Sequence, residues 1–317
     1  MNAAVLVPGR DTLKKLGPFI ALLVLAAGLA VLSPDFLTVG NLFDVTRQVS
    51  INAVISFGMT LVILLGGIDL SVGSILAVSS LVVALLMKAG DSATLAALVG
   101  ILCGALMGVV NGLLVTKGRV APFIATLGTM TLLRGLALVL SQGSPISGFP
   151  SALFSALGGG YFLGVIPLPV VWMLALFAIL WFVLDRTVFG RHVYATGGNP
   201  EAAALSGVNT DRVQILVYTL SGFTAAVAGI ILTSRLDSAQ PTAGAGYELD
   251  AITAVVLGGT SLAGGRGWIF GTLLGALLIG VLNNGLNLVG VSAFYQQVIK
   301  GSVILLAVLL DRAPKND

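Results

Sequence analysis

The sequence is poor in the residues that most catalytic and metal sites need. It has one cysteine, Cys103, and one histidine, His192, so neither a Cys/His metal site nor a Cys/His nucleophile pair can form within the chain. No G-x-S-x-G occurs, and the dipeptide Gly-Lys is absent, which excludes the phosphate-binding loop G-x-x-x-x-G-K-[ST]. We therefore expect no catalytic residue, no metal site and no cofactor bound by this chain.

Charge is also scarce. Only 9% of the 317 residues are charged, whereas soluble domains average about 25%, and 57% are hydrophobic, whereas soluble domains average about 45–50%. The mean hydropathy of +1.05 points the same way and indicates an integral membrane protein in contact with the lipid bilayer. In such a protein the net charge of +3 reflects loop asymmetry and does not suggest nucleic acid binding.

The hydrophobic runs predict an all-α, polytopic fold in a single transmembrane domain, residues 1–317. At about 20 apolar residues per crossing, ten spans are expected near residues 17–33, 46–66, 70–87, 93–115, 122–140, 165–184, 213–233, 250–263, 268–288 and 293–310. The joints at 66–70 and 257–268 leave almost no room for a loop, so they are predicted to be tight hairpins or broken helices.

The basic residues orient these spans. With both termini placed in the cytoplasm, eleven of the 16 Lys and Arg residues fall inside, and only Arg47, Lys88 and Arg235 fall at outer ends. An inverted five-plus-five repeat is possible. The pattern L-G-G-x-x-L-x-x-G occurs at 65–73 and again at 257–265, but both copies face the cytoplasm in this topology and would not correspond under such a repeat.

Polar residues within the spans are candidates for a translocation pathway. Asn52, Ser56 and Thr60 recur every four residues and share one helix face, and Asn283, Asn284 and Asn287 cluster near the end of the ninth span. Amides and hydroxyls suit a neutral, hydroxyl-rich solute. The alternative is that they form hydrogen bonds between helices.

Acidic residues lie near the ends of spans. Asp69 is expected either to cap the following helix with its carboxylate or to lie on the solute pathway, and Asp250 opens the eighth span in the same way. The deeper charges, Arg134 and Lys300, are long side chains that can snorkel or bind carbonyls.

A polar segment, "GGNPEAAALSGVNTDR" at 197–212, separates two apolar stretches. Asn199 is a favourable N-cap, Pro200 fits the first helical position, Glu201 complements the helix dipole and Gly207 suits the end, so a helix is predicted from Pro200 to about Ser206. An isolated helix this short is marginal in water. We expect it to rest on a partner, with self-packing or an interfacial position as the alternative.

Four motifs together carry a resemblance to a known family. These are "GGNPEAAALSGVN", "GMTLVILLGGIDLSVGS", "TKGRVAPFIATLGTMTLLRG" and "SAQPTAGAGYELDAITAVVLGGTSLAGGRG". In these, and over residues 16–311 as a whole, the chain resembles the permease subunits of bacterial ABC importers for monosaccharides, and most of all those for ribose. The resemblance implies an importer in the bacterial inner membrane that moves a monosaccharide from periplasm to cytoplasm.

The same resemblance implies partners and sites. The partners are a second copy of the chain, an ATP-hydrolysing subunit that binds ATP and Mg²⁺, and a periplasmic sugar-binding protein. Within the cytoplasmic loop 185–212, the coupling helix that docks in the ATPase would comprise Asn199, Pro200, Glu201, Ala202, Ala203, Leu205 and Gly207.

The outer loops are expected to receive the binding protein. Arg235, Asp237 and Glu248 flank "SAQPTAGAGY" and are the predicted docking charges, while the uncharged loop 141–164 is either a further docking surface or only a connection. The alternative function is a stand-alone secondary transporter or facilitator for a small neutral polar solute. The lack of a buried carboxylate relay counts against ion coupling, though not against a facilitator.

Overall fold

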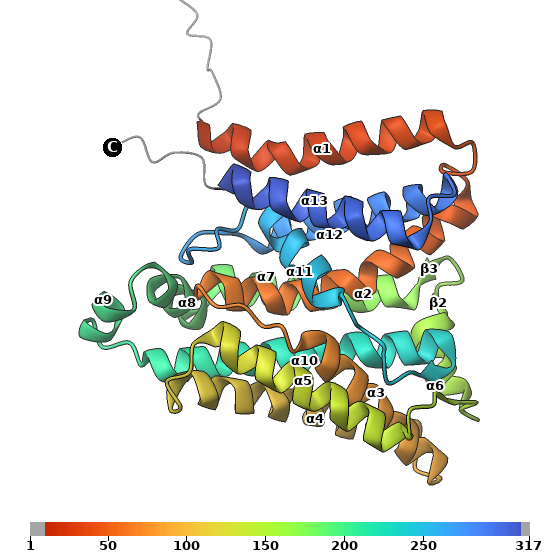
Figure 1. The fold of residues 1–317 in the computed structure, drawn as a ribbon, viewed down its shortest axis with the longest axis horizontal. Helices are drawn as coiled ribbons and strands as arrows, with labels where there is room; N and C mark the ends of the chain where they lie inside the picture. The colour runs from red at the N-terminus through yellow and green to blue at the C-terminus, as the bar shows by residue number, and fades with distance from the viewer. Residues whose placement is uncertain (1–9, 312–317) are drawn as a thin grey trace, which may run out of the picture.

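The computed structural model describes residues 10–311 and is a bundle of long helices with two small two-stranded sheets at one end (Figure 1). The helices in this range are α1 (Arg10–Leu32), α2 (Val39–Leu64), α3 (Val72–Lys88), α4 (Ala93–Thr116), α5 (Pro122–Ser141), α6 (Ala152–Gly159), α7 (Leu168–Arg186), α8 (Val188–Gly198), α9 (Pro200–Leu205), α10 (Thr210–Leu236), α11 (Tyr247–Leu257), α12 (Ile269–Leu288) and α13 (Ala293–Asp311). The strands are β1 (Ile146–Ser147), β2 (Tyr161–Phe162), β3 (Ile166–Pro167) and β4 (Ser238–Ala239).

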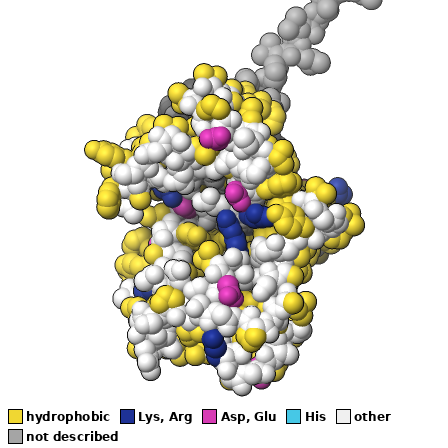
Figure 2. All heavy atoms as spheres, turned by 90° about the vertical axis from the view of Figure 1, so that its right-hand side faces the viewer, with side chains coloured by type: hydrophobic (Ala, Val, Ile, Leu, Met, Phe, Trp, Pro, Cys, Tyr) yellow, Lys and Arg dark blue, Asp and Glu magenta, His cyan; other side chains and the backbone are white. Residues whose placement is uncertain are grey.

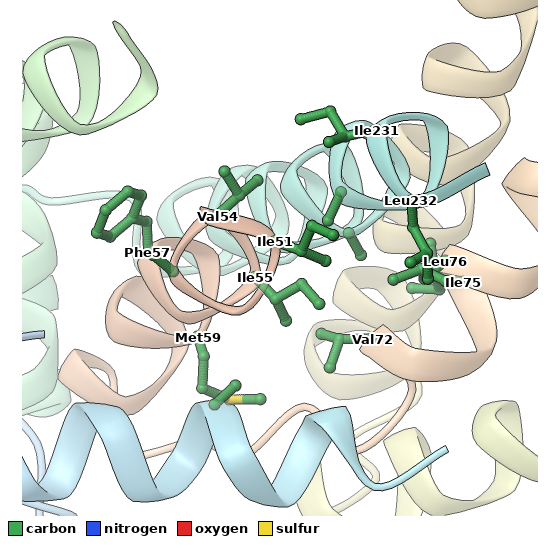
Figure 3. Packing of buried hydrophobic residues seen from close by; sticks show 14 of the residues in the cluster. Ile51, Val54, Ile55, Phe57, Met59, Val72, Ile75, Leu76, Ile231 and Leu232 are labelled. Atoms are coloured by element: carbon green, nitrogen blue, oxygen red, sulfur yellow. The ribbon is translucent and has the colours of Figure 1, made fainter. Parts of the chain in front are cut away.

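Helix α2 is the centre of the bundle. It is buried along most of its length and packs against α7, α10, α11 and α12. Its apolar side chains interlock with those of α3 and α10 (Figure 3), and the largest fully buried ones include Phe57, Ile55 and Met59. By contrast, α4, α5 and α7 are buried over less than a third of their apolar length, so their outer faces meet lipid.

Close helix packing depends on small residues. Gly100, Gly104, Gly108 and Gly112 form one stripe along α4. The last three lie directly on the backbone of α10, whereas Gly100 lies against α3. A Cβ atom on Gly108 would overlap the carbonyl oxygen of Tyr218. Small residues let backbones approach in this way in membrane helices, where the hydrophobic effect does not drive association.

Each predicted span coincides with a helix, and the eighth, expected at 250–263, is the short helix α11 at Tyr247–Leu257. Helix α11 has 11 residues and is about 16 Å long, which is about half of the hydrocarbon thickness. Gly258 ends it, and an irregular segment then leads to α12 at Ile269. Six of the described helices are long and apolar enough to cross a membrane by themselves: α2, α4, α5, α7, α10 and α12.

Two predicted loops contain structure. The outer loop 141–164 includes α6, and its strand β1 pairs antiparallel with β4 through Ile146 and Ala239. The strands β2 and β3 form a hairpin. The loop 185–212 includes α8 as well as the short helix α9.

The bundle has two distinct ends. Helices α8 and α9 project at one end, where α1 begins and α13 finishes, and the sheets and α6 lie at the other (Figure 1). The termini themselves, residues 1–9 and 312–317, lie outside the described residues. We refer to the end with α9 as the α9 end, and to the opposite one as the sheet end.

Candidate functional site

A polar cavity of about 390 Å³ opens at the sheet end of the bundle. Five helices contribute to it: α2, α10, α11, α12 and α13. The lining residues are Gln48, Ile51, Asn52, Leu232, Arg235, Leu236, Tyr247, Asp250, Asn283, Asn287, Gln296 and Lys300. Figure 2 views this end directly and shows acidic and basic side chains close together near its centre, in a hollow between apolar surfaces.

An ion pair lies in the cavity wall. Lys300 Nζ on α13 is 3.1 Å from Asp250 Oδ2 on α11, and Asn52 on α2 also donates a hydrogen bond to this carboxylate. The Asp250 side chain is 10% exposed and that of Lys300 is 28% exposed. The pair therefore joins three helices while keeping contact with the cavity.

Amide side chains form most of the remaining polar surface, together with Arg235 and Tyr247. Gln296 Nε2 donates to Asn287 Oδ1 at 2.8 Å and to the carbonyl of Val291 at 2.9 Å, which links α13 to α12. Asn283 is buried deeper on α12, and its Oδ1 has no hydrogen-bond partner among the described residues. The cavity thus offers both donors and acceptors, with one acceptor unused.

The predicted pathway residues fall into two groups. Asn52, Asn283 and Asn287 line the cavity, and their place on a solute pathway stays a prediction. Ser56 and Thr60 are fully buried below it, and each hydroxyl donates to the carbonyl four residues earlier on α2. Thr60 also shares a 2.7 Å hydrogen bond with Thr272 of α12, so Thr60 links two helices as the alternative interpretation describes, whereas the Ser56 hydroxyl bonds only within α2.

Asn284 also acts between helices. Its side chain exchanges two hydrogen bonds with Asn41 at the start of α2, at 3.0 and 2.7 Å. This reciprocal amide pair ties α2 to α12 and does not line the cavity.

Asp69 lies near the α9 end, away from the cavity. Its Oδ1 accepts from the backbone N–H and the hydroxyl of Ser71 at 3.0 and 2.6 Å, and its Oδ2 accepts from Ser221 of α10 at 2.8 Å. The N-cap residue of α3 is Ser71, so Asp69 stabilises the turn before the helix and does not cap it. Asn111 of α4 donates to Ser71 at 2.8 Å, and the network therefore joins α3, α4 and α10.

Asp250 is not a helix cap either. Helix α11 begins three residues earlier, after Gly246, and Glu248 accepts a hydrogen bond from the Gly246 N–H at 3.1 Å. The carboxylate of Asp250 is directed to Lys300 instead. Arg134 does bind carbonyls, as expected, because it donates to Pro241 and Ala243 at 2.7 and 2.8 Å.

Sequence reasoning missed several cavity residues although a signal existed. Gln48 precedes Asn52 by four residues and continues its stripe, and Gln296 precedes Lys300 by four. Arg235, predicted as a docking charge, lies in the cavity wall. Its position just beyond the predicted span 213–233 gave no sign of which way it faced.

Of the other two predicted docking residues, only Asp237 is exposed. Its Oδ1 accepts from the backbone N–H of Phe149 at 3.1 Å, so it also fixes the loop that contains β1. Glu248 is half-buried next to Arg134.

The predicted short helix is confirmed as α9. Asn199 Oδ1 accepts from the Ala202 N–H at 2.9 Å, Pro200 is the first helical residue and Gly207 has a positive φ of 87°. Ala203 faces inward and is buried, whereas the Leu205 side chain is 91% exposed. The helix presents an apolar side chain to its surroundings at the tip of the molecule.

The chain just before α9 is in backbone contact with two other segments. We call this the glycine junction: Gly197 of α8 lies against the Leu64 carbonyl at the end of α2 and against Gly264 and Gly265 of the α11–α12 connection. The Gly265 N–H donates to the same Leu64 carbonyl at 2.8 Å. A Cβ atom on Gly197 would overlap that carbonyl oxygen, so only glycine fits.

Tyr194 adds a side-chain link at the same place. Its hydroxyl donates to the Gly267 carbonyl at 3.0 Å. Burial raises the pKa of this phenol and the nearby Asp185 carboxylate raises it further, so Tyr194 remains a neutral donor at physiological pH. Helix α8 is therefore attached to the α11–α12 connection both by a hydrogen bond and by backbone contact.

Comparison with known proteins identifies the family. Residues 41–308 match the family described as branched-chain amino acid transport system / permease component. The chain belongs to this permease family. Its members that resemble it include the ribose import permease protein RbsC of Bacillus subtilis, 58% identical over 95% of this chain and 93% of the relative, and that of Escherichia coli K12, 55% identical over 92% of each.

Permeases named for other sugars are more distant. The D-allose transport system permease protein AlsC of Escherichia coli K12 is 43% identical over 94% of this chain and 91% of its own length. No solved structure matches this member of the permease family.

Proposed function

We propose that this chain is the membrane-spanning subunit of an ABC importer that carries ribose from the periplasm to the cytoplasm of a bacterium. The observation that carries the proposal is the opposite placement of two features: a polar cavity opens at one end of the bundle, and a capped helix with an exposed leucine projects from the other. An importer driven from the cytoplasm needs a solute entrance and an attachment for its motor on opposite faces.

The orientation follows from the basic residues. The α9 end faces the cytoplasm, both termini lie there, and the cavity opens to the periplasm. Ten segments of the chain enter the membrane, of which α11 crosses only part of it and continues as irregular, mostly half-buried backbone up to α12.

Helix α9 is the coupling helix. The sequence has no phosphate-binding loop, so ATP and Mg²⁺ bind to a separate subunit, and Leu205 with Glu201 of α9 docks there. Movement of that subunit reaches α2 and the α11–α12 connection through the glycine junction. The cavity lies between these same helices, which gives a physical route from ATP hydrolysis to the solute pathway.

Two further partners complete the importer. A second copy of the chain forms a homodimer in the inner membrane, and a periplasmic sugar-binding protein docks at the sheet end, where Asp237 is exposed. Ribose is the proposed solute because the permeases that share more than half of their residues with this chain are named for it. The amide-rich cavity suits a neutral, hydroxyl-rich molecule.

Reconstitution tests this function. The permease, co-purified with its ATPase subunit, is placed in liposomes with ATP inside and the sugar-binding protein outside, and labelled ribose is followed. We expect uptake that requires both ATP and the binding protein, with arabinose as the competing sugar. Ribose entry by the chain alone, without ATP, would instead support a facilitator.

A further inference from the structure

The outer cavity contains more polar chemistry than a passive passage requires. Water-filled passages need only a polar wall, but here a carboxylate, an ammonium group and several amides converge on one space of about 390 Å³. This volume is within the range of about 300–1,000 Å³ that is usual for small-molecule sites. A monosaccharide fits in it together with water.

We propose that the permease itself binds the sugar in this cavity, in a weak site organised by the Asp250–Lys300 ion pair. The inference rests on the proposed function and deepens it, because it assigns a sugar site to the membrane subunit in addition to the binding protein. The ligand class is a neutral monosaccharide with neighbouring hydroxyl groups.

The ion pair supplies both halves of a diol site. An ionised carboxylate has about four acceptor positions. Asp250 accepts hydrogen bonds from Lys300 and Asn52 in the described structure, so it keeps acceptor capacity for two sugar hydroxyls. An ammonium group has three donors, and Lys300 uses one of them for Asp250. Since the two charges of the pair offset each other, the pair itself requires no counter-ion to bind a neutral ligand, and Arg235 is the further charged residue of the lining.

Buried amide groups extend the site along α12. Asn283 Oδ1 is buried and has no partner among the described residues, so a sugar hydroxyl or a water is the donor that it lacks. Rotation of the terminal amide torsion, which is soft in asparagine, turns this group toward the cavity. At the mouth, Gln296 donates a hydrogen bond to Asn287. When a sugar enters, this hydrogen bond breaks and both amides bond to a sugar hydroxyl instead.

The arrangement also explains why the site is weak. Most of its polar groups already have partners inside the protein, so a sugar replaces existing hydrogen bonds rather than adding new ones. Few apolar surfaces are available for stacking, with Tyr247 as the only aromatic lining residue. Weak binding is compatible with release toward the cytoplasm when the helices move.

Saturation-transfer NMR on the purified permease in nanodiscs tests the proposal, because it detects weak binding without the sugar-binding protein or nucleotide. We expect transfer from the protein to ribose, and at least a tenfold loss of affinity in Asp250→Asn and in Asn287→Leu. Asn287 is exposed at the mouth, so its replacement spares the interior. Ser302→Ala, on the same helix as Lys300 but outside the cavity, is the matched control and should bind as the parent does.

Two results would overturn the sugar site. One is the absence of transfer to ribose in the parent protein, and the other is transfer that persists unchanged in Asp250→Asn and Asn287→Leu. Thermal unfolding of each variant shows whether it is folded, and if Asp250→Asn fails to fold, Asn287→Leu decides. The proposed function is judged separately: uptake that depends on ATP and binding protein, without transfer to the isolated permease, leaves the importer intact and removes only this site.

Discussion

The exposed leucine of α9, the helix proposed to couple the permease to its ATPase, gives the sharpest prediction about the importer. The Leu205 side chain is 91% exposed, and the buried member of the same short helix is Ala203. Complete burial of a leucine side chain is worth about 1.5–3 kcal/mol. If the ATPase covers the exposed fraction, about 1.4–2.7 kcal/mol of the binding free energy depends on this side chain.

Leu205→Asp should therefore weaken the affinity for the ATPase subunit by about 10- to 100-fold, since 1.4 kcal/mol corresponds to a factor of ten. Folding should be unaffected because the side chain has little contact with its own chain. The assay is biolayer interferometry of the permease in nanodiscs with the purified ATPase, followed by ATP-driven ribose uptake with the same variant.

A matched control exists at the other end of the bundle. Leu163, in the β2–β3 hairpin, is 81% exposed, so Leu163→Asp makes the same chemical change on a surface that faces the periplasm in our topology. It should leave the ATPase affinity unchanged. A Leu205→Asp variant that binds the ATPase as tightly as the parent, or a Leu163→Asp variant that loses as much affinity, would refute the coupling assignment.

Three further predictions concern packing, capping and docking. Gly108→Ala should lower the free energy of unfolding by about 1–3 kcal/mol, because its Cβ overlaps α10, whereas Gly128→Ala meets no atom within 4 Å and should be neutral in thermal unfolding. Asn199→Ala removes a helix cap worth about 0.5–2 kcal/mol and should reduce ATP-driven uptake with normal membrane insertion, as immunoblotting of membranes would show. Asp237→Asn keeps an acceptor for the Phe149 N–H but loses the charge. The affinity of this variant for the sugar-binding protein should be lower than that of the parent in low salt and equal to it in high salt. Equal affinities in low salt would contradict the docking assignment.

Helix positions could be predicted from sequence because lipid imposes a simple rule. Every membrane-spanning backbone must satisfy its own hydrogen bonds, so an apolar run of sufficient length forms a helix. That rule located α4, α5 and α7 closely. It placed the end of the eighth span at residue 263, whereas α11 ends at Leu257 with Gly258 as its C-cap.

Short elements were harder to predict for the opposite reason. Helices α6 and α8 lie outside the long apolar runs, and their stability comes from tertiary contacts with α10 and α7 that no local pattern records. Helix α9 was predictable, although it is shorter still, because Asn199, Pro200 and Gly207 specify its ends directly.

The candidate pathway shows where one-dimensional reasoning stops. Asn52, Ser56 and Thr60 do share one face of α2, as their spacing predicts. Their environments differ because α12 covers Thr60 through Thr272, whereas Asn52 reaches the cavity beside Asp250. Spacing gives the face of a helix, but only the neighbouring helices decide which part of that face is open.

The glycine junction has a mechanical consequence. Side chains absorb small displacements by changing rotamer, whereas two backbones in van der Waals contact have no such freedom. At Gly197 the segment that leads into α9 touches the end of α2 and the middle of the α11–α12 connection without any intervening side chain. A small shift of α9 is therefore passed to both segments without the slack that a change of rotamer would provide.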